Sequence, residues 1–231
     1  MNKLVFGVLL ILCISGSANA QISNFAGVNG VPLKVNPYEE IEGTPYLNDG
    51  NWYAGKFINK YGKTVDDVAM RYNIFEDALE CNYQNKAYIF QGKDIREFIY
   101  YTIDKDGHQE VYHFKSGMSI PGNVNSDDYV QVLYEGTNIQ IFKKYYVDNI
   151  NVAPAAYGGL KKQRFVRTEK MWLLTSEGIK EISKVYKRML MNNFPQYEKE
   201  IRKFSKVHDV DWTSYSDIYA LCNYLDQTIV P

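Results

Sequence analysis

The chain has 231 residues and a formal net charge of −1, and 15% of its residues are aromatic, including 20 tyrosines. This charge balance excludes the strongly basic surface on which nucleic-acid binding depends. The length suits one domain with a sizeable core, and the tyrosines favour a β-rich fold whose rings lie between core and solvent.

Residues 1–20 have the pattern of a cleavable secretory signal peptide. A lysine precedes an apolar run over residues 4–14, and small residues follow it up to Ala20. The run is shorter than the ~20 residues that a membrane-spanning helix needs, and the small residues suit signal peptidase. We therefore expect cleavage between Ala20 and Gln21. The protein would then be exported to the periplasm or the outer membrane, or secreted.

The rest of the chain predicts no transmembrane span, because no later segment has about 18 uninterrupted apolar residues. Without the signal peptide, which carries one lysine and no acid, the formal charge is −2. Peripheral contact with a membrane stays open. Three further regions are expected: an extended lead-in over residues 21–50, an antiparallel β domain over residues 51–175, and a helical segment over residues 176–231 packed on that domain.

The lead-in is broken by glycines and prolines, and short alternating segments follow it. In the clearest strand, Val68, Met70, Tyr72 and Ile74 alternate with smaller or polar residues, which places four large apolar side chains on one face. The same alternation places Cys81 on the inward face of the next strand. Further strands are expected over residues 52–58, 87–90, 95–103, 110–114, 129–134, 139–147, 164–167 and 171–174, with a loop over residues 151–163.

The connections between these strands predict an antiparallel meander, either an open sheet or a barrel-like one. Residues 104–107 and 135–138 have the Asp, Asn and Gly content of hairpin turns. No helical pattern separates consecutive strands, which argues against a parallel βαβ arrangement.

The C-terminal part changes to helical spacing. Ile179, Ile182, Val185 and Met189 would lie on one face of a first helix. A second helix would begin near Pro195, and a third would be capped near residues 213–214. The fold class is therefore α+β: an antiparallel meander or open, barrel-like sheet followed by about three helices.

The sequence contains no signature of known catalytic or metal chemistry. Nucleophile elbows, zinc motifs and phosphate-binding loops do not occur in it. His108 and His113 would point to opposite faces of a strand, and His208 would lie at the end of a helix, so structural or surface roles are expected for all three. We assign no catalytic, cofactor-binding or metal-binding residue and expect no cofactor.

Cys81 and Cys222 are the two cysteines that remain after the signal peptide. Both follow inward-facing patterns, which is typical of core thiols. In an oxidising compartment they are also a candidate disulfide, linking an early strand to the last helix. A thiol count on the native protein decides between these alternatives.

Basic residues are densest in the second half of the β region. They are Lys143, Lys144, Lys161, Lys162, Arg164, Arg167 and Lys170. One interpretation is a contact surface for anionic lipid headgroups or an acidic partner, and the other is a solvated strand edge protected against aggregation. Aromatic residues such as Tyr145 and Trp52 are candidates for a sugar-stacking groove, although cross-strand packing explains most of these rings.

Two stretches carry a resemblance to known proteins: Gly43-Thr44-Pro45-Tyr46-Leu47-Asn48-Asp49, followed by Trp52 and Gly55, and Met70-Arg71-Tyr72-Asn73-Ile74-Phe75-Glu76-Asp77-Ala78-Leu79-Glu80. Phe165-Val166-Arg167 and residues 194–201 extend it. They resemble an uncharacterised family of exported Gram-negative bacterial proteins with a Gly-Thr-Pro-Tyr-Leu-Asn-Asp opening and an Arg-Tyr-Asn core. The resemblance implies export and a β-then-helix organisation, but it brings no activity or ligand. Within this chain, Tyr72 is expected in the core, and Arg71 and Asn73 on the other face, where they could serve turn geometry or a partner.

These observations favour a non-catalytic envelope protein that binds a protein, lipid or glycan partner. One alternative is a lipid carrier, in which a curved sheet holds an apolar ligand against the helices. A second alternative is an envelope hydrolase of unfamiliar type, which requires a cleft with closely paired carboxylates.

Overall fold

The computed structural model describes residues 23–25, 28–32, 38–83, 86–103, 107, 109–152 and 162–229. The expected signal peptide, with its Ala20–Gln21 cleavage site, lies outside the described residues. So do His108, Lys161, most of the turn expected over residues 104–107 and most of the loop expected over residues 151–163.

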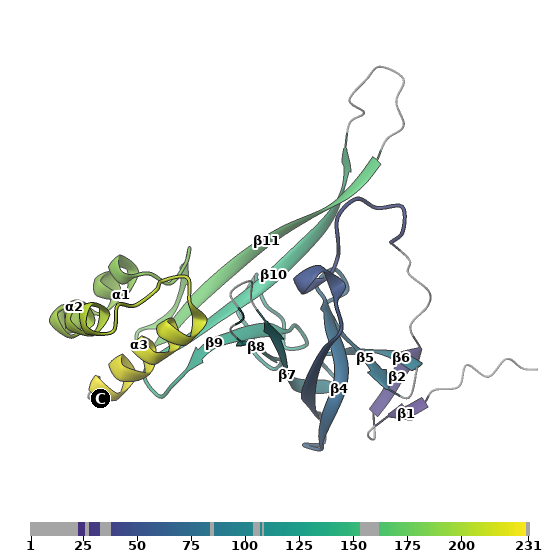
Figure 1. Ribbon diagram of the computed structural model, residues 1–231, viewed down its shortest axis with the longest axis horizontal. Helices are drawn as coiled ribbons and strands as arrows, with labels where there is room; N and C mark the ends of the chain where they lie inside the picture. The colour runs from purple at the N-terminus through teal and green to yellow at the C-terminus, as the bar shows by residue number, and fades with distance from the viewer. Residues whose placement is uncertain are drawn as a thin grey trace, which may run out of the picture.

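The strands of the described residues form one open antiparallel sheet of 12 strands, in the order β1-β2-β6-β5-β4-β3-β7-β8-β9-β10-β11-β12 (Figure 1). They are β1 (Ser23–Phe25), β2 (Val28–Pro32), β3 (Tyr53–Asn59), β4 (Thr64–Asn73), β5 (Ala78–Tyr83), β6 (Lys86–Gln91), β7 (Ile95–Ile103), β8 (Gln109–Lys115), β9 (Val130–Glu135), β10 (Gln140–Val152), β11 (Lys162–Thr175) and β12 (Gly178–Ile182). The predicted α+β class with an open antiparallel sheet is confirmed. The lead-in, for which no strand is expected, contains β1, β2 and a 3-10 turn, η1 (Leu47–Gly50). These elements are too short to show a hydrophobic period in the sequence.

Strand β4 confirms the predicted alternation, because Val68, Met70, Tyr72 and Ile74 are all buried. Its neighbour β5 departs from the pattern: Glu80 is fully buried, at 0% exposure, whereas Tyr83 is exposed. The reason is that the segment around η1 covers the second face of β5, so that strand is buried on both faces at its start.

Three hydrophobic clusters make up the core of the described residues. The largest lies over β3 to β8 and contains Phe57, Tyr72, Phe98 and Phe114. A second joins the far end of the sheet to the helices, and a third, smaller one surrounds Trp172. Figure 1 shows the helices on the left and β4 to β6 on the right.

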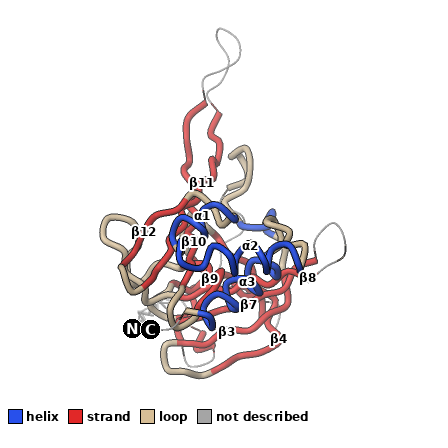
Figure 2. The backbone as a smooth tube through the Cα atoms, turned by 90° about the vertical axis from the view of Figure 1, so that its left-hand side faces the viewer, coloured by secondary structure: helices blue, strands red, loops and turns tan. Residues whose placement is uncertain are grey.

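Strands β10 and β11 form a long hairpin that projects from the sheet (Figures 1 and 2). They pair from Gln140–Leu174 to Val152–Lys162, but β9 reaches only Lys143 of β10. The prediction of two short strands over residues 164–167 and 171–174 is therefore wrong, since one continuous strand covers both. Thr168, Glu169 and Lys170 lack the apolar alternation by which a strand is recognised, because all three are exposed on this hairpin.

The helix expected from Ile179 is also wrong at its start, because Gly178–Ile182 is a strand that pairs with β11. Thr175 pairs with Gly178, which leaves a two-residue turn, and Gly178 has φ 118°, a conformation that glycine adopts easily. In the described residues, the α-helices are α1 (Lys187–Asn193), α2 (Glu198–Val207) and α3 (Tyr215–Thr228). A 3-10 turn, η2 (Pro195–Tyr197), precedes α2, and Ser214 caps α3 by accepting a hydrogen bond from the Asp217 amide. The second and third expected helices are confirmed.

One aspartate attaches the helical segment to the sheet. Asp226 of α3 accepts hydrogen bonds from the backbone amides of Thr137 (3.0 Å), Asn138 (2.7 Å) and Ile139 (2.7 Å) in the β9–β10 turn. The approach is so close that a Cβ atom at Gly136 would lie 2.6 Å from the Asp226 carboxyl carbon, so only glycine fits there. No helix of the described residues is long and apolar enough to cross a membrane.

Candidate functional site

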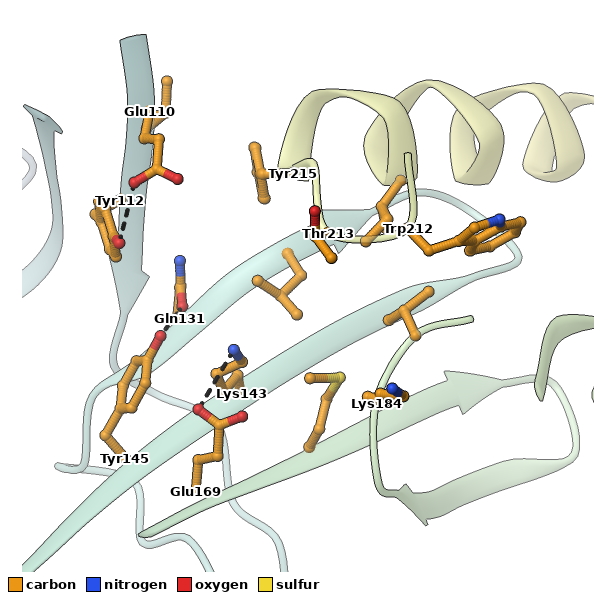
Figure 3. A pocket seen from close by; sticks show the side chains of 15 residues that line it. Glu110, Tyr112, Gln131, Lys143, Tyr145, Glu169, Lys184, Trp212, Thr213 and Tyr215 are labelled. Atoms are coloured by element: carbon orange, nitrogen blue, oxygen red, sulfur yellow. Dashed lines mark hydrogen bonds and ion pairs between the residues drawn. The ribbon is translucent and has the colours of Figure 1, made fainter. Parts of the chain in front are cut away.

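A pocket of about 240 Å³ lies where the sheet meets the helical segment (Figure 3). Strands β8 to β11 provide one wall, and the segment before α1 and the start of α3 provide the other. Its polar and aromatic lining residues are Glu110, Tyr112, Gln131, Lys143, Tyr145, Glu169, Lys184, Trp212, Thr213 and Tyr215. The pocket therefore lies at the boundary between the two large core clusters.

Hydrogen bonds fix the polar groups of the sheet wall. The Tyr145 hydroxyl donates to Gln131 Oε1 at 2.7 Å, and both residues are buried. The Tyr112 hydroxyl donates to Glu110 Oε2 at 3.3 Å. Burial, reinforced by the Glu110 carboxylate, raises the pKa of Tyr112 to about 12, so this phenol stays protonated and can donate at neutral pH.

The charges that line the pocket balance one another. Glu110 and Glu169 are the acids, and Lys143 and Lys184 are the bases. Lys143 Nζ lies 3.5 Å from Glu169 Oε2. Glu169, Lys184 and Thr213 are exposed, so they mark the rim of the pocket. A site with this balance favours a ligand that is polar but carries little net charge.

The helix wall contributes rings and aliphatic side chains. Tyr215 begins α3, and its hydroxyl donates to the Val132 carbonyl at 3.4 Å. Burial raises the pKa of Tyr215 to about 12. Trp212 lies just before α3 and lines the pocket, as does Val185 from the segment before α1. The closure of the pocket thus depends on the docking of the helical segment.

A ladder of tyrosines leads from the middle of the sheet to the pocket. Tyr53 stacks on Tyr100 with ring centroids 5.5 Å apart, and Tyr100 stacks on Tyr112 at 5.1 Å. These residues lie on β3, β7 and β8, which are adjacent strands. The ladder holds the Tyr112 ring in a fixed position at the pocket wall.

The structure separates the basic residues that the sequence brings close together. Lys144 is buried and lies 2.6 Å from Asp77, while Lys143 lines the pocket. Arg164 pairs with Glu42 at 2.9 Å, and Lys170 lies 3.9 Å from Glu181. Lys162 and Arg167 make no ion pair with any described residue, and Lys161 is outside the described part. The described members thus divide between the two faces of the hairpin, because neighbours in a strand point to opposite faces.

The two thiols occupy different cores. Cys81 belongs to the cluster over β3 to β8, and Cys222 to the cluster beneath the helices. Both are buried and free. Burial raises the pKa of both thiols, to about 12 for Cys222, which makes them poor nucleophiles at neutral pH.

A buried ion pair and its neighbours form what we call the Arg71 cluster: Tyr46, Trp52, Arg71, Asn73 and Glu80. Arg71 Nε donates to Glu80 Oε2 at 2.8 Å, and its guanidinium lies between the Tyr46 and Trp52 rings, 4.1 and 4.4 Å from their centroids. Asn73 donates to Glu80 at 3.1 Å and accepts from the Glu76 amide in the following turn. The expectation that Asn73 serves turn geometry is thereby confirmed.

Most of the pocket residues carry no signal in the sequence. The pattern points to Tyr145 for stacking and to Lys143 for a contact surface, but Glu110, Gln131 and Trp212 come from separate elements without a common motif. His113 Nε2–H donates to Glu97 Oε1 at 2.8 Å. Within the described part of the chain, no three His, Cys, Asp or Glu side chains gather as a metal site would require.

In comparisons with known proteins, no family model, no curated protein and no solved structure matches this chain. The resemblance to the exported Gram-negative family therefore stays a prediction, and the function must be argued from the pocket itself.

Proposed function

We propose that this protein is an exported, non-catalytic binding protein of the cell envelope, and that its pocket holds a sugar unit of a neutral glycan. One observation carries the proposal: the pocket combines rings with two acids and two bases whose charges balance. Sugars present hydroxyl and amide groups around an apolar ring face. Fixed hydrogen-bonding groups beside Tyr or Trp rings suit both features.

The polar lining favours a glycan over the acyl chain of a lipid. Glu110, Gln131 and Lys143 would lose water beside an acyl chain without gaining hydrogen bonds in return. A sugar hydroxyl both donates and accepts, so it satisfies carboxylates and ammonium groups alike. The volume of about 240 Å³ is below the roughly 300–1,000 Å³ of typical small-molecule pockets, which suits one unit of a longer chain.

Titration calorimetry with an oligosaccharide of N-acetylglucosamine tests the proposal, because this probe is neutral and carries both hydroxyl and amide groups. We expect saturable binding, and about tenfold weaker binding for Trp212→Ala, since an aromatic contact contributes about 1 kcal/mol beyond its buried area. Tyr61→Ala is the matched control, because Tyr61 is 70% exposed and does not line the pocket.

Three other outcomes decide against the proposal. Binding of a fatty acid in place of the oligosaccharide, with the same dependence on Trp212, would indicate a lipid carrier. Cleavage of the oligosaccharide by the wild-type protein, abolished by Glu110→Gln or Glu169→Gln, would indicate a hydrolase. An unchanged affinity in Trp212→Ala would place the glycan outside this pocket.

A further inference from the structure

Lys144 and Asp77 meet in a setting that differs from an ordinary surface ion pair. Lys144 Nζ lies 2.6 Å from Asp77 Oδ2, and the lysine side chain is only 7% exposed. Lys144 belongs to β10, while Asp77 lies in the turn between β4 and β5, 67 residues earlier. A primary amine and a carboxyl group are thus held in contact between two parts of the sheet that are not neighbouring strands.

The Asp77 carboxyl group also has hydrogen-bond donors directed at it. The Tyr72 hydroxyl donates to Oδ1 at 2.5 Å, and the Tyr129 amide lies 3.3 Å from Oδ1 and 3.4 Å from Oδ2. Donors placed in this way stabilise negative charge that develops on a carbonyl oxygen. Asp77 has φ 46°, which is uncommon for a residue other than glycine and points to a constrained side-chain position.

A second carboxylate completes the group. Asp128 Oδ2 lies 3.5 Å from Lys144 Nζ, within reach of a proton that leaves the amine after a small movement. The Tyr72 ring packs against Phe114 and Phe98, with centroids 4.8 and 5.8 Å away, so the donor side of the site is apolar. We propose that Lys144 and Asp77 condense without an enzyme to form an intramolecular isopeptide bond.

The condensation balances without a co-reactant. Proton transfer from the Lys144 ammonium to the Asp77 carboxylate gives a neutral amine and a carboxylic acid. The amine lone pair attacks Asp77 Cγ and a C–N bond forms. The π electrons of the carbonyl move onto Oδ1, where Tyr72 and Tyr129 donate. Asp128 takes a proton from the attacking nitrogen and returns it to Oδ2. The electrons on Oδ1 re-form the carbonyl as the C–Oδ2 bond breaks, and Oδ2 leaves with its two protons as one water molecule.

The local electrostatics favour the neutral carboxylic acid that the reaction needs. Burial raises the pKa of the Asp77 carboxyl, against the opposing effects of Lys144 and Tyr72, so the protonated acid is more accessible than at an exposed aspartate. The lysine, at 7% side-chain exposure, lies in a poorly hydrated position, which also favours loss of water over hydrolysis of the product.

The bond would give the protein a covalent cross-link that does not depend on redox conditions. Its two core thiols are free and lie in separate clusters. An isopeptide bond would instead tie the β4–β5 hairpin to the base of the projecting β10–β11 hairpin, next to the sheet wall of the pocket.

Mass spectrometry of a tryptic digest of the purified, folded protein tests the proposal. We expect a branched peptide in which residues 72–86 are joined to residues 144–161, with a mass equal to the sum of both peptides less one water. Trypsin cannot cut after an acylated Lys144, so the peptide 145–161 should be absent. Recovery of residues 72–86 and 145–161 as separate peptides in full amount would overturn the proposal. The wild-type protein alone gives this answer.

Variants test the roles of the individual groups. Asp77→Ala and Lys144→Ala should give no branched peptide. Asp128→Asn should slow its formation, which a time course of the linked fraction in freshly synthesised protein measures. Lys170→Ala is the matched control, because Lys170 pairs with Lys144 across the strands but is exposed, and this variant should link fully. Normal linkage in Asp128→Asn would contradict the proton transfer assigned to Asp128.

Discussion

The Arg71 cluster and the pocket contain the same kinds of side chain, yet they differ in where their hydrogen bonds go. In the Arg71 cluster, Glu80 is at 0% exposure and receives donors from Arg71, Tyr46 and Asn73. In the pocket, the acids and bases lie along an open cavity, and the Lys143–Glu169 pair is 3.5 Å long. In the Arg71 cluster the charged groups satisfy one another, whereas in the pocket they keep hydrogen-bonding groups available for a ligand.

This difference separates residues that hold the fold from residues that can bind. A buried ion pair whose members satisfy each other has little to offer a partner, and removing one member is costly. Balanced charges at a rim cost little to rearrange. Tyr46, Arg71, Asn73 and Glu80 belong to the Arg71 cluster, so we infer that the stretches around them maintain the sheet and the segment around η1.

Arg71→Ala tests the structural role and should have the largest effect. It leaves the Glu80 carboxylate buried without its cation, and we expect the free energy of unfolding to fall by about 3–5 kcal/mol. Chemical denaturation measures this change. Adding Glu80→Gln to the Arg71→Ala background should restore part of the loss, because it removes the unpaired charge.

Arg202→Ala is the matched control for this test. Arg202 pairs with Glu198 at 2.7 Å, but both side chains are about half exposed, so the loss should be within about 0.5 kcal/mol. If Arg71→Ala and Arg202→Ala had equal effects, the Arg71 cluster would be no more important to stability than the surface.

Asp226→Ala should have the next largest effect, and it should act on the pocket side. Three backbone amides of the β9–β10 turn lose their charged acceptor. We expect the free energy of unfolding to fall by about 3 kcal/mol in total. Hydrogen exchange should become faster in α1 to α3 and remain slow in β4 and β5. Uniform acceleration over both regions would show that sheet and helices unfold as one unit.

The sequence predicts the sheet well where one face is buried and the other is wet. Residues 95–103 match β7, and Tyr72 lies in the core as its alternation requires. The prediction from sequence fails where another segment covers the outer face of a strand. Glu80 follows a polar, outward pattern, yet the segment around η1 lies over it, and nothing local to β5 encodes that contact.

Most residues of the pocket could not be predicted from the sequence, because a long-range contact brings them together. Glu110, Lys143 and Trp212 come from β8, β10 and the segment before α3, and only the docking of the helices brings them together. The anchor of that docking, Asp226, lies 87 residues from Ile139 in sequence. A single aspartate on a helix carries no pattern by which such a long-range contact is recognised.

The His113–Glu97 pair is half-buried, so it is intermediate between the buried Arg71 cluster and the open pocket. Replacing His113 should change the stability least. Burial lowers the pKa of His113 from its ordinary value of 6.5, although the adjacent Glu97 carboxylate opposes the shift. The unfolded chain therefore takes up this proton more readily than the folded protein. Stability should fall as the pH decreases below about 6.5, and the contribution should be complete above it. His113→Gln should flatten this part of the profile when the free energy of unfolding is measured from about pH 5 to 8. Parallel profiles for the wild-type protein and His113→Gln would contradict this prediction, because they would show that the imidazole has the same pKa in the folded and unfolded states.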